Sequence, residues 1–307
     1  MIRFILLRSF RALITMLLAV TLVFVFLRLS GDPAAALAPP DVGQEVIDQY
    51  RAKMGLDRPL PVQYFNYVTS LLSGEFGYSI HTGQPALGIF LERLPNTLVL
   101  GGAALFIALA VGIPIGVIAA LNRDCGIDRG VMAFSVFAFA MPNFFFGLVV
   151  ILVGALVFGI FFGGTAGTAT LGAVLAPALT LGLASTGAFA RFSRSSMLET
   201  LNKPFMVAAE ARGVPRMRRL VRHAGPNAAI PLVTLIGLSL GALIAGSVVT
   251  EQVFAWPGVG QLLVRSVATR DIAVVQFLVL AVAMTMTLAN LAVDLLYHTI
   301  DPRIRAR

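Results

Sequence analysis

Long apolar runs, separated by shorter polar segments, dominate the chain. Residues 12–27 and 97–121 contain no charge, and no charged residue occurs between Arg129 and Arg191. A transmembrane helix needs about 20 largely apolar residues. We therefore expect six transmembrane helices, near residues 9–28, 97–121, 131–159, 171–190, 229–250 and 274–298. The glycine-rich residues 163–168 are the expected turn between the third and the fourth.

The composition fits a membrane protein. Of the 307 residues, 58% are hydrophobic and 12% are charged, against about 25% charged in an ordinary soluble domain. A soluble fold this apolar would expose large hydrophobic patches, so a soluble enzyme, a disordered chain and a fibrous repeat are excluded. The predicted class is an all-α polytopic membrane protein. The first run and the small-residue triplet at 36–38 also fit a cleaved signal peptide, but the run is long for one and the triplet lies well beyond its end.

The positive charge indicates the orientation in the membrane. The chain has 23 basic and 15 acidic residues, a formal net charge of +8. Six helices put both termini on one side, and sixteen of the basic residues fall in the segments on that side. The positive-inside rule therefore predicts that both termini are cytoplasmic. Topology accounts for the charge, so we expect the lipid bilayer and no nucleic acid as a partner. Cys125 is the only cysteine, which excludes a disulfide within the chain.

Two segments outside the predicted spans are long enough to fold. Residues 30–95 face outward, carry several aromatic residues and contain a helical pattern near 61–73. They form either a packed cap or a docking surface for an external partner, since aromatic residues serve both purposes. We divide the chain into residues 1–95, an N-terminal span with its extracytoplasmic segment, and residues 96–307, a five-helix core.

The second segment, residues 191–228, is basic and cytoplasmic. Residues 205–212 predict a short helix that Gly213 breaks, and a second basic helix follows, ended by Pro226. One interpretation of this hairpin is an arginine-rich anchor on lipid headgroups. The alternative is docking into a groove of a partner, which the small side chains of Ala208 and Ala209 favour.

The chain lacks the chemistry of an enzyme. It has no P-loop motif, its three histidines are isolated from one another, and the serines in the spans have no evident base. We therefore predict no catalytic residue and no metal site. Asp294, near the inner end of the last span, is the exception among spans nearly free of ionisable groups, and we expect it to be structural. The scarcity of such groups disfavours a self-sufficient secondary transporter or channel, which remains the alternative class.

Several residues in the spans are candidates for a pore or gate. They are Pro142, Asn143, Ser239, Gly241 and Ser247. Pro142 interrupts the third span and favours a kink. Gly112-x-x-x-Gly116 and Gly237-x-x-x-Gly241 let helix backbones approach closely, and packing alone is the commoner role of such spacing.

Several sequence blocks are characteristic of one family. They are RLSGDPA at 28–34, GLDRPLPVQY at 55–64, ERLPNTL at 92–98, ARFSRSSMLE at 190–199, TEQVFAWPGVGQLLVRSV at 250–267 and NLAVDLLYHTIDPRIR at 290–305. Through these blocks the chain resembles, over almost its whole length, the B-type permease subunit of dipeptide, oligopeptide and nickel ABC importers. The resemblance implies a type I ABC importer permease fold in the bacterial cytoplasmic (inner) membrane.

The resemblance also implies partners. They are a second, C-type permease, two cytoplasmic ATPases and an extracytoplasmic substrate-binding protein. Substrate would pass between the two permeases by alternating access. ATP and Mg²⁺ would be held by the ATPases, and this chain would hold no cofactor. Peptides are the commonest cargo of the family, with nickel, sugars and opines carried by close relatives.

The family's ATPase-docking loop has the pattern E-A-A-x-x-x-G. Here the pattern reads Val207-Ala208-Ala209-x-x-x-Gly213, with valine in place of the first glutamate and Glu210 where the peptide branch usually has a basic residue. The resemblance therefore implies that ATPase coupling rests on this set: Ala208, Ala209, Glu210, Arg212 and Gly213.

Overall fold

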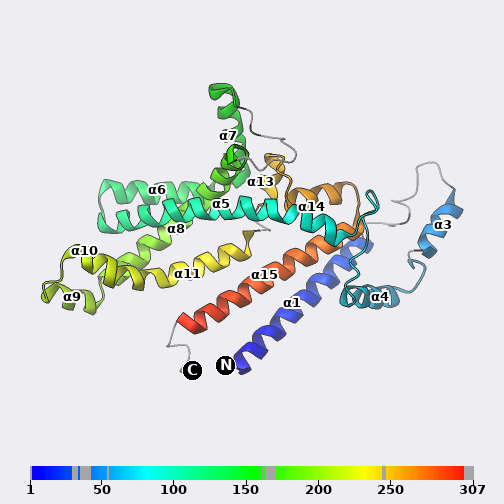
Figure 1. Ribbon diagram of the computed structural model, residues 1–307, viewed down its shortest axis with the longest axis horizontal. Helices are drawn as coiled ribbons and strands as arrows, with labels where there is room; N and C mark the ends of the chain where they lie inside the picture. The colour runs from blue at the N-terminus through cyan, green and yellow to red at the C-terminus, as the bar shows by residue number, and fades with distance from the viewer. Residues whose placement is uncertain are drawn as a thin grey trace. The chain divides into compact units, whose positions relative to one another are not determined.

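The computed structural model describes residues 2–29, 34, 43–53, 55–160, 162, 171–243 and 247–300. In this part of the chain all regular structure is helical, apart from one isolated bridge between Tyr78 and Pro85, so the all-α class is confirmed (Figure 1). The helices form two compact units. The first comprises the residues up to Pro95 together with Gly258–Leu291, and the second comprises Asn96–Pro257 and the chain from Ala292. The functional division into residues 1–95 and 96–307 stays a prediction.

Among the described residues, five helices are long and apolar enough to cross a membrane. They lie within α1 (Ile2–Leu29), α5 (Ala86–Leu121), α8 (Leu171–Leu201), the segment Arg216–Gly241 and α15 (Ile272–Ile300). A bent pair of helices, α6 (Gly126–Ala140) and α7 (Asn143–Phe158), is the sixth candidate span by its combined length and composition. Each predicted span thus has a counterpart, although α5 and α8 extend well beyond the expected ends.

The third span is not the single helix expected over residues 131–159. Its halves meet at an angle of 100°. Pro142 has no backbone N–H and disfavours helical backbone at the residue before it. Met141 accordingly takes an extended conformation, with φ −81° and ψ 130°. The kink expected at Pro142 is confirmed, and it is sharp enough to divide the span. The turn expected at 163–168 lies outside the described residues.

In the second unit, α6, α7 and α11 (Gly225–Gly241) pack against α8, and α5 approaches α8 through two glycines. A Cβ atom on Gly112 would lie 2.8 Å from the Cβ of Phe189, and one on Gly116 would lie 2.8 Å from the Cβ of Ser193. Real Cβ atoms do not approach so closely. The packing interpretation of this glycine pair is confirmed.

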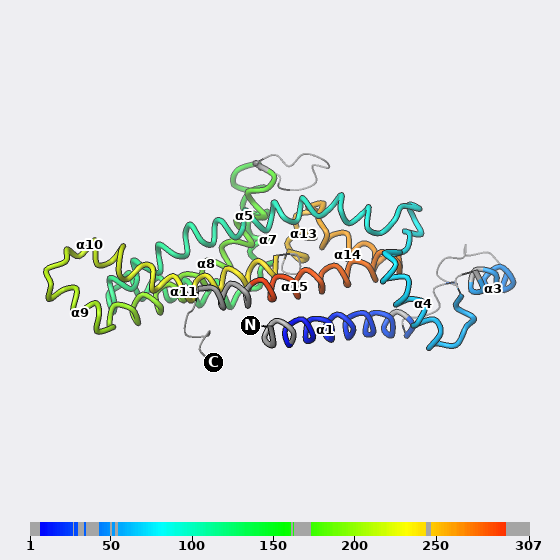
Figure 2. The backbone as a smooth tube through the Cα atoms, turned by 60° about the horizontal axis from the view of Figure 1, so that its bottom comes forward, coloured from blue at the N-terminus to red at the C-terminus, as the bar shows by residue number. Residues whose placement is uncertain are grey.

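The first unit contains α1, α3 (Gln44–Lys53), α4 (Leu60–Leu72), α14 (Val259–Ala268) and the start of α15. Figures 1 and 2 show α1 and α15 side by side. Phe24 of α1 packs against Tyr64 and Tyr67 of α4, with ring centroids 5.3 and 5.8 Å apart. The hydroxyls of Thr21 and Tyr64 share a hydrogen bond of 2.7 Å. These contacts hold α4 at the C-terminal end of α1, and the helix expected near 61–73 is confirmed.

The basic segment after Pro215 differs from expectation. α10 (Arg216–Arg218), the π-helical turn η1 (Arg219–Ala224) and α11 form one helical run to Gly241. Gly225 donates its N–H to the carbonyl of Leu220, five residues back. This wider turn precedes Pro226, which then sits in the first turn of α11, where a helix does not need its missing N–H. The expectation that Pro226 ends the helix is wrong for this reason.

Candidate functional site

A short hairpin joins α8 to the helical run that begins at Arg216. α9 (Pro204–Ala211) ends just before Gly213, which has a left-handed backbone with φ 72°. The N–H of Gly213 donates to the carbonyl of Glu210 at 2.8 Å, and that of Val214 donates to Ala209 at 3.1 Å. These bonds satisfy carbonyls at the helix end. The conformation expected at Gly213 is confirmed.

The hairpin lies at the end of the second unit where α5 and α6 are joined (Figures 1 and 2). Met206 of α9 belongs to a buried cluster with Ala120 at the end of α5 and with Met197 of α8. Two segments predicted to be cytoplasmic therefore lie together. This cluster packs the hairpin against two of the spans.

The two alanines of the docking motif lie in different surroundings. Ala209 is buried in the chain itself, whereas Ala208 is exposed. They therefore do not share one exposed face, which differs from the expectation of paired small side chains for a partner. Ala208 can meet a partner directly, and Ala209 positions α9 from inside. Their role in coupling stays a prediction.

Glu210 is engaged within the hairpin. Its Oε1 lies 2.7 Å from Nη1 of Arg219 on η1. The acid that replaces the usual basic residue of the motif therefore forms an ion pair within the chain. Both residues line a cavity of about 250 Å³, which Arg216 also borders. Arg212 is exposed beside the break. The charge presented outward is therefore basic.

The exposed side of the hairpin combines apolar and basic residues. Val207, Met217 and Val221 are 63%, 68% and 66% exposed. Four exposed arginines accompany them: Arg212, Arg216, Arg218 and Arg222. Apolar contact area surrounded by charge is typical of a protein interface. The arrangement is suited to docking on a partner with acidic groups.

The candidate pore residues lie on separate helical segments of the second unit. Pro142 and Asn143 mark the bend between α6 and α7. Ser239 donates its hydroxyl to the carbonyl of Leu235 in its own helix at 2.8 Å, and Gly241 is buried at the end of α11. That helix ends earlier than the expected span, which ran to residue 250. A pore or gate role for these residues stays a prediction.

The fifth candidate, Ser247, contacts a buried acid that sequence reasoning missed. Glu251 of α13 (Val248–Val253) is fully buried, and its Oε1 accepts hydrogen bonds from the hydroxyls of Ser247 at 2.9 Å and Thr97 at 2.8 Å. A buried carboxyl group is stable only with such partners. Glu251 lies one residue beyond the end of the expected span at 229–250 and was not among the candidate residues. The sequence signal that could have identified Glu251 is an acidic residue directly after an apolar run.

Trp256 and Asn96 fix the chain next to this acid. The indole N–H of Trp256 donates to the carbonyl of Asn96 at 3.0 Å, and the amide of Asn96 donates to the carbonyl of Pro257 at 2.9 Å. Trp256 is buried with Leu100 and Val174. The TEQVFAWPG block therefore has a structural basis, because its tryptophan packs between α5 and the start of α8.

Comparison with known families decides the identity. Residues 112–306 match the family described as "Binding-protein-dependent transport system inner membrane component", and residues 1–101 match the family of its N-terminal part. The chain belongs to this family. It is a multi-pass permease component of the bacterial inner membrane.

Relatives of this permease cover its full length. The glutathione transport system permease protein GsiC of Salmonella typhimurium is 38% identical over 306 residues, 99% of both chains. The oligopeptide transport system permease protein AppB of Bacillus subtilis is 36% identical over 304 residues, 95% of this chain and 96% of its own. An inward-facing structure of the MetNI methionine ABC transporter aligns with a TM-score of 0.59 and 18% identity, over 69% of this chain and 96% of that one. The type I ABC importer permease fold is thereby confirmed.

Proposed function

We propose that this permease carries di- or oligopeptides inward, in an importer driven by ATP. The observation that carries the substrate class is the pair of relatives over 95–99% of the chain, one named for glutathione, itself a tripeptide, and one for oligopeptides. The spans contain no cluster of His, Cys, Asp or Glu in the described residues that could hold a metal ion, which gives no support to nickel as cargo.

The partners follow from the same proposal. A second, C-type permease completes the translocation path, two cytoplasmic ATPases supply the energy, and an extracytoplasmic binding protein delivers the peptide. ATP and Mg²⁺ belong to the ATPases, since this chain has no P-loop sequence. We assign no catalytic residue and no cofactor to the permease itself.

The hairpin transmits ATPase movement to the spans. Its exposed side, with Val207, Met217 and the surrounding arginines, docks on an ATPase, and its buried side is anchored by Met206 to α5 and α8. A rigid displacement of α9 therefore moves both helices together. Such rigid-body motion is a known way to switch between two access states.

The test is uptake of a radiolabelled tripeptide into proteoliposomes. The full importer with its binding protein should accumulate peptide only with ATP, and the permease alone should accumulate none. Met217→Asp should abolish recovery of the ATPases with the permease, while Val62→Asp, an equally drastic change on helix α4 of the first unit, should not. Gradient-driven uptake by the isolated permease would refute the proposal.

A further inference from the structure

The first unit contains a cavity of about 640 Å³ that no role in coupling explains. Its walls come from the end of α1, from α4, from the loop at 74–78 and from the start of α15. The volume lies in the range of pockets that hold small molecules, about 300–1,000 Å³. By the predicted orientation the cavity is at the extracytoplasmic side.

Two wall residues carry polar atoms without a hydrogen-bond partner among the described residues. They are Oε1 of Gln63 and the hydroxyl of Tyr67. Gln63 is only 9% exposed, and its Nε2 donates to the carbonyls of Leu56 at 3.0 Å and Arg58 at 2.6 Å, which identifies Oε1 as the free acceptor. Burial raises the pKa of Tyr67 to about 12, so its hydroxyl keeps its proton and can donate. Unpaired buried polar atoms are rare and call for an explanation.

The wall formed by the loop is held in place before any ligand binds. The buried Asp271 accepts a hydrogen bond of 2.5 Å from the hydroxyl of Ser79, and His81 contacts the carbonyl of Thr269 at 3.0 Å. Gly77 lies so close to α15 that an added Cβ would be 3.0 Å from the Cβ of Ala273. A preformed wall reduces the entropy lost when a ligand binds.

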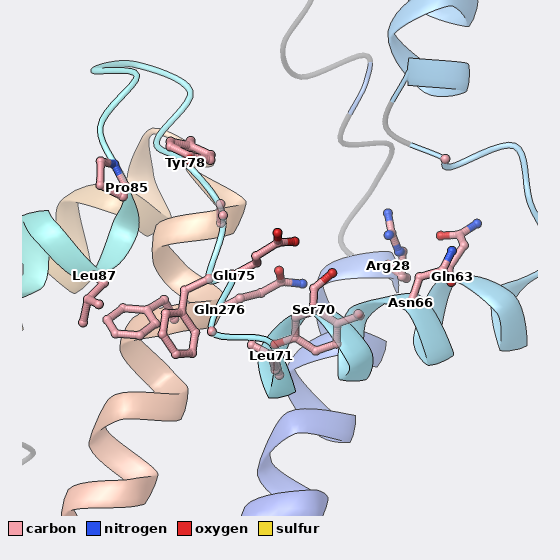
Figure 3. A pocket seen from close by; sticks show the side chains of 17 residues that line it. Arg28, Gln63, Asn66, Ser70, Leu71, Glu75, Tyr78, Pro85, Leu87 and Gln276 are labelled. Atoms are coloured by element: carbon pink, nitrogen blue, oxygen red, sulfur yellow. The ribbon is translucent and has the colours of Figure 1, made fainter.

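The polar groups of the cavity are of the kinds that a peptide requires. Figure 3 shows Ser70, Glu75 and Gln276 gathered in the middle of the pocket, with Arg28 further along beside Asn66 and Gln63. Amide and hydroxyl side chains can donate to peptide carbonyls and accept from peptide N–H groups. The carboxylate of Glu75 matches a molecule with an ammonium group.

The other end of the cavity is apolar. Phe76 and Phe277 lie with ring centroids 4.7 Å apart, and Leu87 and Pro85 lie near the same end. An apolar side chain next to an ammonium group at Glu75 would find its place there. A small zwitterion without an apolar side chain would make no contact with this apolar end of the cavity.

We propose that this cavity is an outer binding site for a short peptide with a free amino terminus. The ammonium group binds at Glu75, the first side chain lies against Phe76 and Phe277, and the peptide amides bond to Gln276, Gln63 and Tyr67. The site would hold the peptide between its release by the binding protein and its entry into the path. This inference rests on the proposed peptide import and adds a site to it.

The experiment measures peptide binding to the permease–ATPase complex in nanodiscs, without the binding protein. The probe is tritiated Phe-Ala-Ala, and the blocked peptide N-acetyl-Phe-Ala-Ala is its chemical control. Glu75→Gln should weaken binding of Phe-Ala-Ala about tenfold, the effect expected of losing a charged hydrogen-bond partner. Glu45→Gln on α3, which removes the same charge from an exposed site outside the cavity, should leave binding unchanged. The blocked peptide should bind the parent about as weakly as the free peptide binds Glu75→Gln.

A photoreactive analogue places the site. A tripeptide with p-benzoylphenylalanine in first position should label the segments at 63–78 or 273–277, and excess Phe-Ala-Ala should prevent the labelling. Equal peptide binding by Glu75→Gln and Glu45→Gln would overturn the proposed site. So would photolabelling of other segments, or labelling that is prevented by phosphatidylethanolamine but not by Phe-Ala-Ala. Peptide uptake by the complete importer separates the two failures. Uptake without Glu75-dependent binding refutes only the outer site, and absent uptake refutes the proposed function.

Discussion

Arg194 of α8 forms a two-point ion pair with Asp128 at the start of α6. Its Nη2 donates to Oδ2 of Asp128 at 2.7 Å, and its Nε bonds to Oδ1. The side chains are only 21% and 4% exposed, and the backbone N–H of Asp124 also donates to Oδ2 at 3.0 Å. The pair connects the helix that leads into the hairpin with the helix that bends at Pro142. A displacement of α9 can therefore be transmitted through α8 and this ion pair to α6 and α7.

Breaking this pair should destabilise the permease strongly. Asp128→Asn leaves the guanidinium of Arg194 without its countercharge in a nearly buried site, which costs about 3 kcal/mol. The measurement is thermal unfolding of the purified permease in detergent. Asp124→Asn is the control, because that side chain is 80% exposed. Equal unfolding temperatures for the two variants would show that the pair contributes nothing.

The glycines of α5 allow a second comparison within one helix. Gly116→Ala places a Cβ against α8 and should lower the unfolding temperature, whereas the Cβ of Gly102→Ala meets open space. Gly102→Ala should be neutral or should stabilise the permease by up to about 1 kcal/mol, since alanine has a higher helix propensity than glycine. Similar effects of both changes would mean that close packing at Gly116 does not matter.

The sequence allowed prediction of the six spans, the helix near 61–73, the break at Gly213 and the kink at Pro142. Each depends on local properties: an apolar run, a turn residue or a missing N–H. The continuation of the helix through Pro226 could not be predicted, because the π turn that accommodates the proline is formed five residues earlier, where no residue type specifies it.

The polar contacts could not be predicted either, since they join distant residues. Thr97 and Glu251 are separated by 154 positions, and Asp128 and Arg194 by 66. The different burial of Ala208 and Ala209 depends on how α9 is rotated against α5 and α8. Such rotation is a property of packing that a motif of small residues does not record.

The buried acid provides a third prediction. Thr97→Val keeps the shape of the side chain but removes one of the hydrogen bonds to the buried carboxyl group of Glu251, which should cost about 1–2 kcal/mol. Thr180→Val is the matched control, since the buried hydroxyl of Thr180 donates only to the carbonyl of Ala176 in its own helix. Unfolding midpoints of the two variants decide. If Thr180→Val destabilises the permease as much as Thr97→Val, the hydrogen bond to Glu251 makes no particular contribution to stability.

The two alanines of α9 should respond differently to tryptophan. Ala208→Trp adds bulk to an exposed surface, so the permease should fold normally but recover less ATPase in a pull-down. Ala209→Trp forces a large ring into the buried side, so the permease itself should lose stability by about 1–3 kcal/mol. Pull-down and thermal unfolding are measured on both. Reduced stability of Ala208→Trp with intact ATPase recovery would reverse the assignment of the two faces.

Gly213 separates backbone conformation from contact. Its φ of 72° suits glycine and is tolerated by asparagine, but a β-branched residue there costs about 1–2 kcal/mol or more. No atom lies within 4 Å of the position that its Cβ would take, so the strain is in the backbone alone. Gly213→Val should therefore turn α10 away from α9 and sharply reduce ATPase recovery and ATP-driven uptake. Gly213→Asn should keep most of both, because asparagine adopts the left-handed conformation at lower cost. Insertion into the membrane should be unchanged in each variant, since it depends on apolar runs far from the hairpin. If Gly213→Val transports like the parent, the geometry of the hairpin does not carry the coupling and the hairpin serves as a lipid anchor.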